Sequence, residues 1–130
     1  MLGLTRILCG VSRETDSLRY DLGEKKATRP VVVWNTTRRC NLHCIHCYSE
    51  SQDKSYPGEL DHEEGLSLID SLTEYGAPVL LFSGGEPLMR PDLLELAAYA
   101  IRKGLRTVLS TNGTLITPSV AKGLKKAGFS

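Results

Sequence analysis

Three cysteines crowd into one short polar segment of this 130-residue chain. Cys40, Cys44 and Cys47 are separated by three and then two residues. Thiolates are soft ligands that select iron–sulfur clusters, zinc or cuprous copper. A [4Fe–4S] cluster bound only by protein takes four thiolates, so three of them leave one iron open to a substrate or cofactor. The spacing therefore predicts a three-thiolate cluster site that can do chemistry as well as carry electrons.

Two other interpretations of these cysteines stay open. In a helix the three positions would share one face and belong to a core, although the polar residues between them disfavour this. A closed zinc site, made of the three cysteines with His43 or His46, is the stronger rival because such sites are common. The spacing alone does not separate zinc from the cluster.

Charged and aromatic neighbours of the cysteines also have two interpretations. His46 is either an ordinary polar loop residue or a flat ring that lies against an adenine. Arg38 and Arg39 are either solvated charges or partners that offset the negative charge of a cluster and raise its reduction potential. Cys9 stands apart from the others, and we expect an ordinary free thiol there.

Composition indicates one soluble globular domain with a real core. Hydrophobic residues make up 41% of the chain, and 16 Lys and Arg against 15 Asp and Glu leave a net charge of +1. This balance predicts neither nucleic acid nor a membrane surface as the main partner. We find no bilayer-length apolar run and no signal peptide, and thiols clustered in this way are typical of reducing compartments, so we expect a cytoplasmic protein.

Three strands alternate with three helices, which predicts an α/β fold with a parallel sheet and right-handed crossovers. We expect strands over 31–34, 79–82 and 105–109. We expect helices that begin near Asp61, Pro91 and Thr117 and end at Gly76, Gly104 and Gly128. Residues 31–34 form a continuous apolar run, which is typical of a strand buried on both faces.

Polar segments follow the carboxyl ends of all three strands, and in a parallel sheet these ends share one edge. The first is the cysteine-rich loop, and the third is the turn Thr111-Asn112-Gly113. The second is the turn Gly84-Gly85-Glu86-Pro87, whose glycines allow a ligand to approach the backbone. Its glutamate would suit an ammonium group, or it simply favours the N-terminus of the next helix. The order of elements predicts that these segments together build an active site.

These motifs together resemble the signature of the radical S-adenosylmethionine (SAM) superfamily. Cys40, Cys44 and Cys47 match its cluster ligands and His46 its ring position, and residues 84–87 match its Gly-Gly-Glu-Pro turn. The resemblance implies a [4Fe–4S] cluster whose open iron is chelated by SAM, with the turn (Gly84, Gly85, Glu86 and Pro87) hydrogen-bonded to the SAM amino group. It also implies reductive cleavage of SAM to a 5′-deoxyadenosyl radical, with a reductase, flavodoxin or ferredoxin as electron donor.

A narrower resemblance is to the haem-biosynthesis branch of that superfamily. It is carried by residues 30–40, 44–50, 56–60 and 78–92. It implies an iron tetrapyrrole as substrate and removal of acetate side chains, with didecarboxysiroheme as the expected compound. Haem d₁ biosynthesis and peptide-modifying maturation are alternatives within the superfamily. A zinc-stabilised interaction module is the alternative of another class.

The resemblance also implies a (βα)₆ TIM-like partial barrel, of which the sequence shows three βα units. We divide the chain into an N-terminal lead-in, 1–29, and the N-terminal half of the core domain, 30–130, which stops before a fourth strand. The chain alone is then expected to be incomplete and inactive, and to self-associate through exposed sheet edges. A second chain that completes the barrel is a further expected partner.

Overall fold

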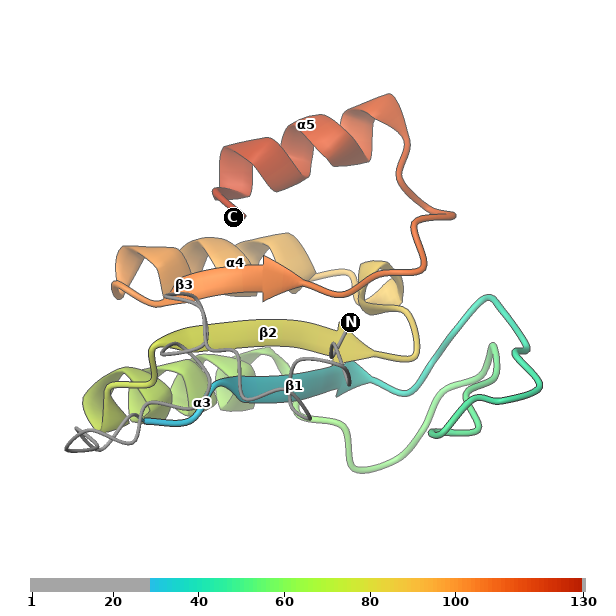
Figure 1. Cartoon of the computed structure of the whole chain (residues 1–130), viewed down its shortest axis with the longest axis horizontal. Coiled ribbons are helices and arrows are strands. Elements are labelled where there is room, and N and C mark those ends of the chain that lie inside the picture. The colour runs from blue at the N-terminus through green and yellow to red at the C-terminus, as the bar shows by residue number, and fades with distance from the viewer. Residues whose placement is uncertain (1–28, 130) are drawn as a thin grey trace, which may run out of the picture.

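The computed structural model describes residues 29–129, which form three consecutive βα units (Figure 1). The predicted lead-in therefore lies outside the described residues except for Arg29, and so does Cys9. The elements are β1 (Val32–Thr37), α3 (His62–Tyr75), β2 (Val79–Gly84), the 3₁₀ turn η2 (Pro87–Met89), α4 (Leu93–Arg102), β3 (Arg106–Leu109) and α5 (Pro118–Ala127).

The three strands form one parallel sheet in the order β1-β2-β3. Trp34, Phe82 and Leu109 stand side by side in its register. The strands lie side by side with their arrowheads toward the same end, and long connections leave that end (Figure 1). The α/β fold with parallel strands is thus confirmed. None of the helices within residues 29–129 has the length and apolar character that crossing a bilayer requires.

The core lies between the sheet and the helices α3 and α4, with α5 packed on α4. Alternate residues of a strand point to opposite faces, and the helix-facing set contains Trp34 and Phe82, whose rings are 5.7 Å apart. Ile69 of α3 and Leu96 of α4 are fully buried against them. This apolar layer holds the sheet against the helices, and so it fixes the strand ends from which the connecting loops start.

The expectation that the first strand is buried on both faces is wrong. Val31 and Val33 remain 57% and 55% exposed, whereas Trp34 is buried. The helices α3 and α4 cover only the Trp34 face, and no described residue covers the other face. The apolar run therefore signals two apolar faces, of which the described part of the chain covers one.

Local capping explains where the helices begin and end. The predicted capping box of α3 is present: the Asp61 carboxylate accepts from the Glu64 N–H, and the Glu64 carboxylate accepts from the Asp61 N–H, both at 2.9 Å. Gly76 ends α3 with a left-handed φ of 75°. The helix α4 begins at Leu93, later than Pro91 predicts; Asp92 occupies the N-cap position, and its carboxylate makes no cap hydrogen bond.

Candidate functional site

The three polar segments meet at the carboxyl edge of the sheet, as the order of elements predicts. We call residues 38–59 the Cys loop, residues 84–87 the glycine turn and residues 111–113 the Asn-Gly turn. The Asn112 side chain donates to Asn41 of the Cys loop at 3.0 Å, and Asn41 donates to the Thr114 hydroxyl at 2.8 Å. The loop after β1 is therefore hydrogen-bonded directly to the connection after β3.

Glu86 joins the glycine turn to the Asn-Gly turn. Its side chain is fully buried. It accepts hydrogen bonds from the Thr111 hydroxyl and the Asn112 N–H, both at 2.7 Å, and from the Leu88 N–H at 3.0 Å. A buried carboxylate with three donors is a stable hydrogen-bonding centre. The alternative given above, that Glu86 favours the N-terminus of the next helix, matches its contact with η2. Contact of this turn with a cofactor amino group stays a prediction.

The two glycines of the glycine turn allow it to lie against residues 37–40, which we call the root of the Cys loop. The Gly85 N–H donates to the Thr37 carbonyl at 2.7 Å, and the Glu86 N–H donates to the Arg39 carbonyl at 2.9 Å. A Cβ on Gly84 would collide with the Thr37 carbonyl oxygen, and φ there is 142°. A Cβ on Gly85 would lie 2.5 Å from the Arg39 carbonyl oxygen. In the described part of the chain, the close backbone approach is to the chain itself. Pro87, the last residue of the turn, is buried at the start of η2.

The three predicted thiolates lie on the Cys loop in different surroundings. Cys40 is buried at the root of the loop, Cys44 is exposed and Cys47 is half-buried. The sulfur of Cys40 accepts from the Leu42 N–H at 3.4 Å and faces the Asn112 amide nitrogen at 3.9 Å. Within residues 29–129, no three His, Cys, Asp or Glu side chains converge on a point that could hold one metal ion. Their role as cluster ligands stays a prediction.

The surroundings of Cys47 favour its thiolate. The Ser49 hydroxyl lies 3.3 Å from its sulfur and is itself 2.7 Å from the Ser51 hydroxyl. The side-chain hydrogen bond with Ser49, helped by backbone hydrogen bonds from Ser51 and Ser49, lowers the pKa of Cys47 to about 7. The thiolate, which is the ligand form of cysteine, is thus accessible near neutral pH.

Three other residues that the sequence singled out are placed on the surface of the loop. His46 is exposed. Arg38 donates through Nε to the Ser49 carbonyl, and Arg39 donates through Nε to the Asp53 carboxylate, both at 2.6 Å. Both guanidinium groups are about half-exposed. In this structure the two arginines brace the loop internally.

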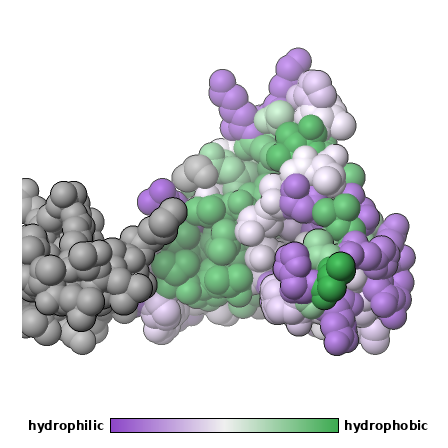
Figure 2. Space-filling view, turned by 45° about the vertical axis from the view of Figure 1, so that its right-hand side comes forward, coloured by the Kyte–Doolittle hydropathy of each residue, from purple (hydrophilic) through white to green (hydrophobic). Residues whose placement is uncertain are grey.

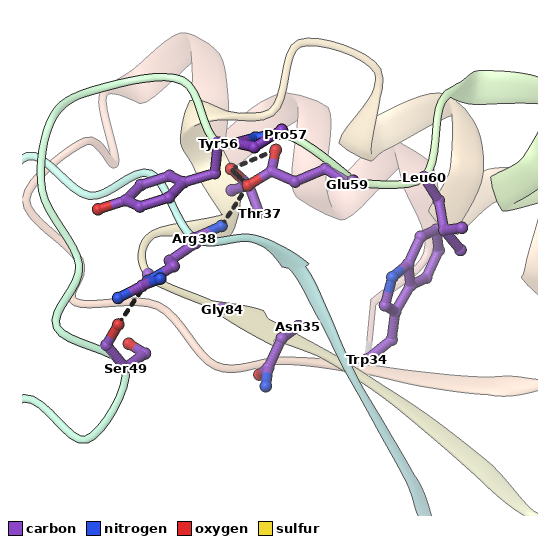
Figure 3. Close-up of a pocket in the computed structure, with 12 residues that line it drawn as sticks. Trp34, Asn35, Thr37, Arg38, Ser49, Tyr56, Pro57, Glu59, Leu60 and Gly84 are labelled. Carbon is purple, nitrogen blue, oxygen red and sulfur yellow. Dashed lines mark hydrogen bonds between the residues drawn. The ribbon is translucent and has the colours of Figure 1, made fainter.

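A cavity of about 420 Å³ opens beside the root of the Cys loop (Figure 3). In Figure 3 the side chains of Arg38 and Tyr56 lie at one end and those of Trp34 and Leu60 at the other, with Gly84 between them. The Arg38 guanidinium lies 4.6 Å from the centre of the Tyr56 ring. The cavity thus offers cationic, aromatic and backbone groups next to the glycine turn.

Two charged residues that the sequence analysis did not single out support this arrangement. The Glu59 carboxylate accepts from the Thr37 hydroxyl at 3.0 Å and from the Arg38 N–H at 2.6 Å. Arg90, which follows η2, reaches the backbone on both sides of the Cys loop. Neither contact has a local sequence signal, since Glu59 and Arg90 bind backbone groups that are 21 and 54 residues away along the chain.

A family model described as "Radical SAM superfamily" matches residues 34–130. The chain belongs to the radical SAM superfamily. The match runs over all three βα units and includes the Cys loop, the glycine turn and the Asn-Gly turn.

Curated radical SAM relatives match the chain closely in sequence. Fe-coproporphyrin III synthase of Methanosarcina barkeri is 52% identical over 100% of this chain and 35% of its own length. AdoMet-dependent heme synthase of Nitratidesulfovibrio vulgaris is 47% identical over 82% of this chain and 29% of its own length. Mycofactocin maturase MftC of Mycobacterium tuberculosis is 42% identical over 75% of this chain and 25% of its own length. The chain therefore spans about a third or less of the curated relatives that it matches.

A solved structure confirms the fold. The crystal structure of BtrN in complex with AdoMet and 2-DOIA superposes with a TM-score of 0.67 and 21% sequence identity. The match covers 78% of this chain and 43% of that chain. The three βα units thus share the fold of the matched part of that structure, a parallel α/β arrangement consistent with a partial TIM-like barrel.

Radical SAM enzymes use a [4Fe–4S] cluster and S-adenosylmethionine, and the donor set of the Cys loop fits the cluster. Three thiols on one loop are the ligand type that iron–sulfur clusters require. The N–H group that faces the Cys40 sulfur and the hydroxyl that faces the Cys47 sulfur are the kind of outer hydrogen bonds that tune such clusters. The cavity beside the glycine turn provides space where β1 runs into the Cys loop, lined there by Thr37, Arg38 and Ser49.

Proposed function

We propose that this chain forms the cluster- and SAM-binding part of a radical SAM enzyme of haem biosynthesis. The observation that carries the proposal is the hydrogen-bonded contact of the Cys loop with both the glycine turn and the Asn-Gly turn. These contacts gather the three signature segments of the chain at one edge of the sheet, where α/β proteins place their chemistry. An N-terminal lead-in, residues 1–29, would precede this part.

Each predicted site residue has a defined task in this proposal. Cys40, Cys44 and Cys47 would hold the cluster, and the open iron would accept the cofactor. The glycine turn (Gly84, Gly85, Glu86 and Pro87) would bind the amino group of SAM, and His46 would lie against its adenine. When bound, the cluster and SAM supply a 5′-deoxyadenosyl radical that abstracts hydrogen from the substrate. The chain's own contribution is to orient both groups and to keep Glu86 and its donors rigid beneath them.

The proposed substrate is an iron tetrapyrrole, and the proposed reaction removes acetate side chains from didecarboxysiroheme. The relative that matches the whole chain is named for Fe-coproporphyrin III, which supports a tetrapyrrole. A relative that matches at lower identity is named pre-heme d1 synthase, and another is a mycofactocin maturase, so these two activities are the alternatives. A reductase, flavodoxin or ferredoxin would donate the electron, and a second chain would complete the barrel. Clustered thiols of this kind are typical of reducing compartments, so the protein would act in the cytoplasm.

Anaerobic reconstitution of the chain with iron and sulfide tests the cluster. We expect equal amounts of bound iron and sulfide and a brown absorbance that dithionite bleaches. Cys44→Ala should abolish this uptake, whereas His43→Ala and His46→Ala should retain it. A colourless protein that holds zinc tightly, and that loses it in one of the histidine variants, would establish the zinc-stabilised module instead.

Titration of the reconstituted chain with iron coproporphyrin III tests the substrate class. We expect a shift of the Soret band of the tetrapyrrole that saturates with added protein. Serum albumin at the same concentration controls for nonspecific uptake of the macrocycle. An unchanged band, together with binding of a fluorescently labelled precursor peptide, would favour the maturase alternative.

A further inference from the structure

Arg90 is a buried arginine whose five N–H groups all have acceptors. Its side chain is 8% exposed. Nε donates to Asp92 Oδ1 at 2.7 Å, Nη1 donates to the carbonyls of Thr36 at 3.1 Å and Leu60 at 2.7 Å, and Nη2 donates to the Asp61 carbonyl at 3.2 Å and to Asp92 Oδ2 at 2.9 Å. The two bonds to Asp92 are bidentate, which fixes the plane of the guanidinium group.

The three carbonyls that Arg90 binds lie on opposite sides of the Cys loop. Thr36 is in β1, just before the loop begins, whereas Leu60 and Asp61 lie between the end of the loop and α3. One side chain therefore holds together the two ends of the segment that carries the thiols. A lysine could not make all five bonds of Arg90, because its ammonium group has three donors and no planar fork.

Arg90 also connects the two ends of the Cys loop to the glycine turn. Its backbone N–H donates to the Pro87 carbonyl at 3.0 Å, so the side chain starts directly from the 3₁₀ turn that follows Glu86. Its guanidinium group lies 5.4 Å from the centre of the Trp34 ring on β1. On the other side of the loop root, the Glu86 N–H donates to the Arg39 carbonyl at 2.9 Å. The root of the Cys loop is thus held from two sides by residues of one short segment.

We propose that Arg90 is a positioning residue that sets the Cys loop against the glycine turn, so that the thiols and the cofactor-binding turn keep a fixed relation. It touches neither the thiols nor the cavity beside Arg38, and it acts through the carbonyls at the loop ends. The part of this inference that concerns the cluster rests on the proposed function. The part that concerns the order of the loop does not.

Hydrogen exchange on the metal-free chain tests the order of the loop. The reporters are the amides of Cys40, which donates to Gln52, and of Glu86, which donates across to the loop root. In Arg90→Gln we expect both to exchange about tenfold faster or more, because a hydrogen bond to a charged group contributes roughly 1.5–3 kcal/mol. The amides of β2 should change much less. Arg106→Gln, which removes an exposed arginine at the start of β3, is the control that should change neither reporter.

Arg90→Lys keeps the charge and serves if Arg90→Gln does not fold. It should speed exchange at the same two amides and leave the strand amides slow. Exchange that rises equally in the sheet and in the loop, or that does not rise at all, would overturn the proposal and leave Arg90 a general packing residue.

Electron paramagnetic resonance of the reconstituted, reduced chain tests the consequence for the cofactor. Addition of SAM should change the cluster signal of the parent chain. In Arg90→Lys we expect the same iron and sulfide content but about a tenfold higher SAM concentration for half of this change, in the range found for outer-shell variants of metal sites. An unaltered SAM dependence in Arg90→Lys would refute the positioning role. A parent chain that binds no cluster would refute the proposed function alone, because the exchange measurement needs no metal.

Discussion

At the scale of single residues, Cys47 is the thiol whose chemistry the fold alters most clearly. The Ser49 hydroxyl is 3.3 Å from its sulfur, and hydrogen bonds to the sulfur stabilise the thiolate over the thiol. The pKa of Cys47 is lowered to about 7, whereas an ordinary thiol ionises near pH 8.5. About half of the Cys47 thiols are therefore ionised at pH 7, so binding a metal there releases fewer protons than binding to an ordinary thiol would.

Alkylation of the reduced, metal-free chain with iodoacetamide measures this effect. We expect the rate at Cys47, followed by peptide mass spectrometry, to reach half of its maximum at about pH 7. Ser49→Ala should move this midpoint to higher pH, since the largest stabilising hydrogen bond is lost. Ser71→Ala, which removes a hydroxyl on the exposed side of α3, should leave it in place. Identical profiles in the parent chain and in Ser49→Ala would contradict the assignment.

Gly84 is a second residue whose identity the fold dictates. Its φ of 142° is a conformation that other residues rarely adopt, and a Cβ would collide with the Thr37 carbonyl oxygen. Backbone strain of this kind alone usually costs about 1–3 kcal/mol. Because the collision adds to this strain, we expect Gly84→Ala to lower the free energy of unfolding by a larger amount. Gly104→Ala is the matched control, because φ is 89° there but a Cβ meets nothing within 4 Å. Urea unfolding of both variants measures the contribution of the collision, because only Gly84→Ala has one. Equal losses of unfolding free energy in the two variants would show that the chain shifts to avoid the collision.

At the scale of elements, the sequence predicts the helices better than their junctions. The capping box at Asp61 and the glycine at Gly76 are local signals, so they place α3 correctly. The start of α4 is less well predicted: Pro91 indicates a start before the observed Leu93, and the Asp92 carboxylate at the N-cap binds Arg90 and His62 instead of capping the helix. Such a choice between partners depends on residues distant in sequence, and local patterns cannot express it.

The same reasoning explains what was found and missed at the candidate site. The strand order predicted that three polar segments would meet, because parallel strands share an edge, and the contact between Asn41 and Asn112 confirms it. The tasks of Glu59 and Arg90 could not be predicted, since both act on backbone carbonyls or N–H groups that become neighbours only after folding. Residue type and spacing carry information about ligands. They carry very little about which backbone groups a side chain will hydrogen-bond after folding.

The pair His62 and Asp92 joins the start of α3 to the start of α4 and gives this junction a pH dependence. Their side chains are 2.9 Å apart, and the hydrogen bond to Asp92 raises the pKa of His62 above its ordinary value of 6.5. Burial alone would raise the pKa of Asp92, but hydrogen bonds from Arg90 and His62 outweigh it and hold that pKa below its usual value. A raised pKa in the folded state stabilises the fold fully below pH 6.5, and the gain is lost as the pH rises through the raised value.

Thermal unfolding of His62→Gln tests this junction. We expect the melting temperature of the variant to fall below that of the parent chain at about pH 5.5, and the difference to be smaller at about pH 9, since the gain is lost as the pH rises through the raised pKa of His62. Asp92 stays ionised at both values, because its folded pKa lies below the ordinary 3.8. His43→Gln, at an exposed position of the Cys loop, is the control. A difference that is constant with pH would mean that His62 contributes by packing alone.

At the scale of the whole molecule, the described residues leave one face of the sheet open. Val33, Leu81 and Val108 stand in one row of the sheet register, on the face opposite the helices. Figure 2 shows a broad hydrophobic area on this side of the molecule. Within residues 29–129, β1 and β3 each pair with a single neighbour, so both edges also retain free backbone groups. Open edges beside an apolar face favour association with another chain.

Light scattering at several concentrations tests whether the chain associates through this face. We expect the parent chain to form dimers or larger species as its concentration rises. Val33→Glu should shift it toward the monomer, because Val33 is 55% exposed on the edge strand and a charge there opposes both strand pairing and apolar contact. Ile116→Glu is the matched control, since Ile116 is 44% exposed but lies in the connection between β3 and α5. A parent chain that stays monodisperse and monomeric would contradict this prediction, whereas equal effects of the two substitutions would point to nonspecific apolar contact in place of the open sheet.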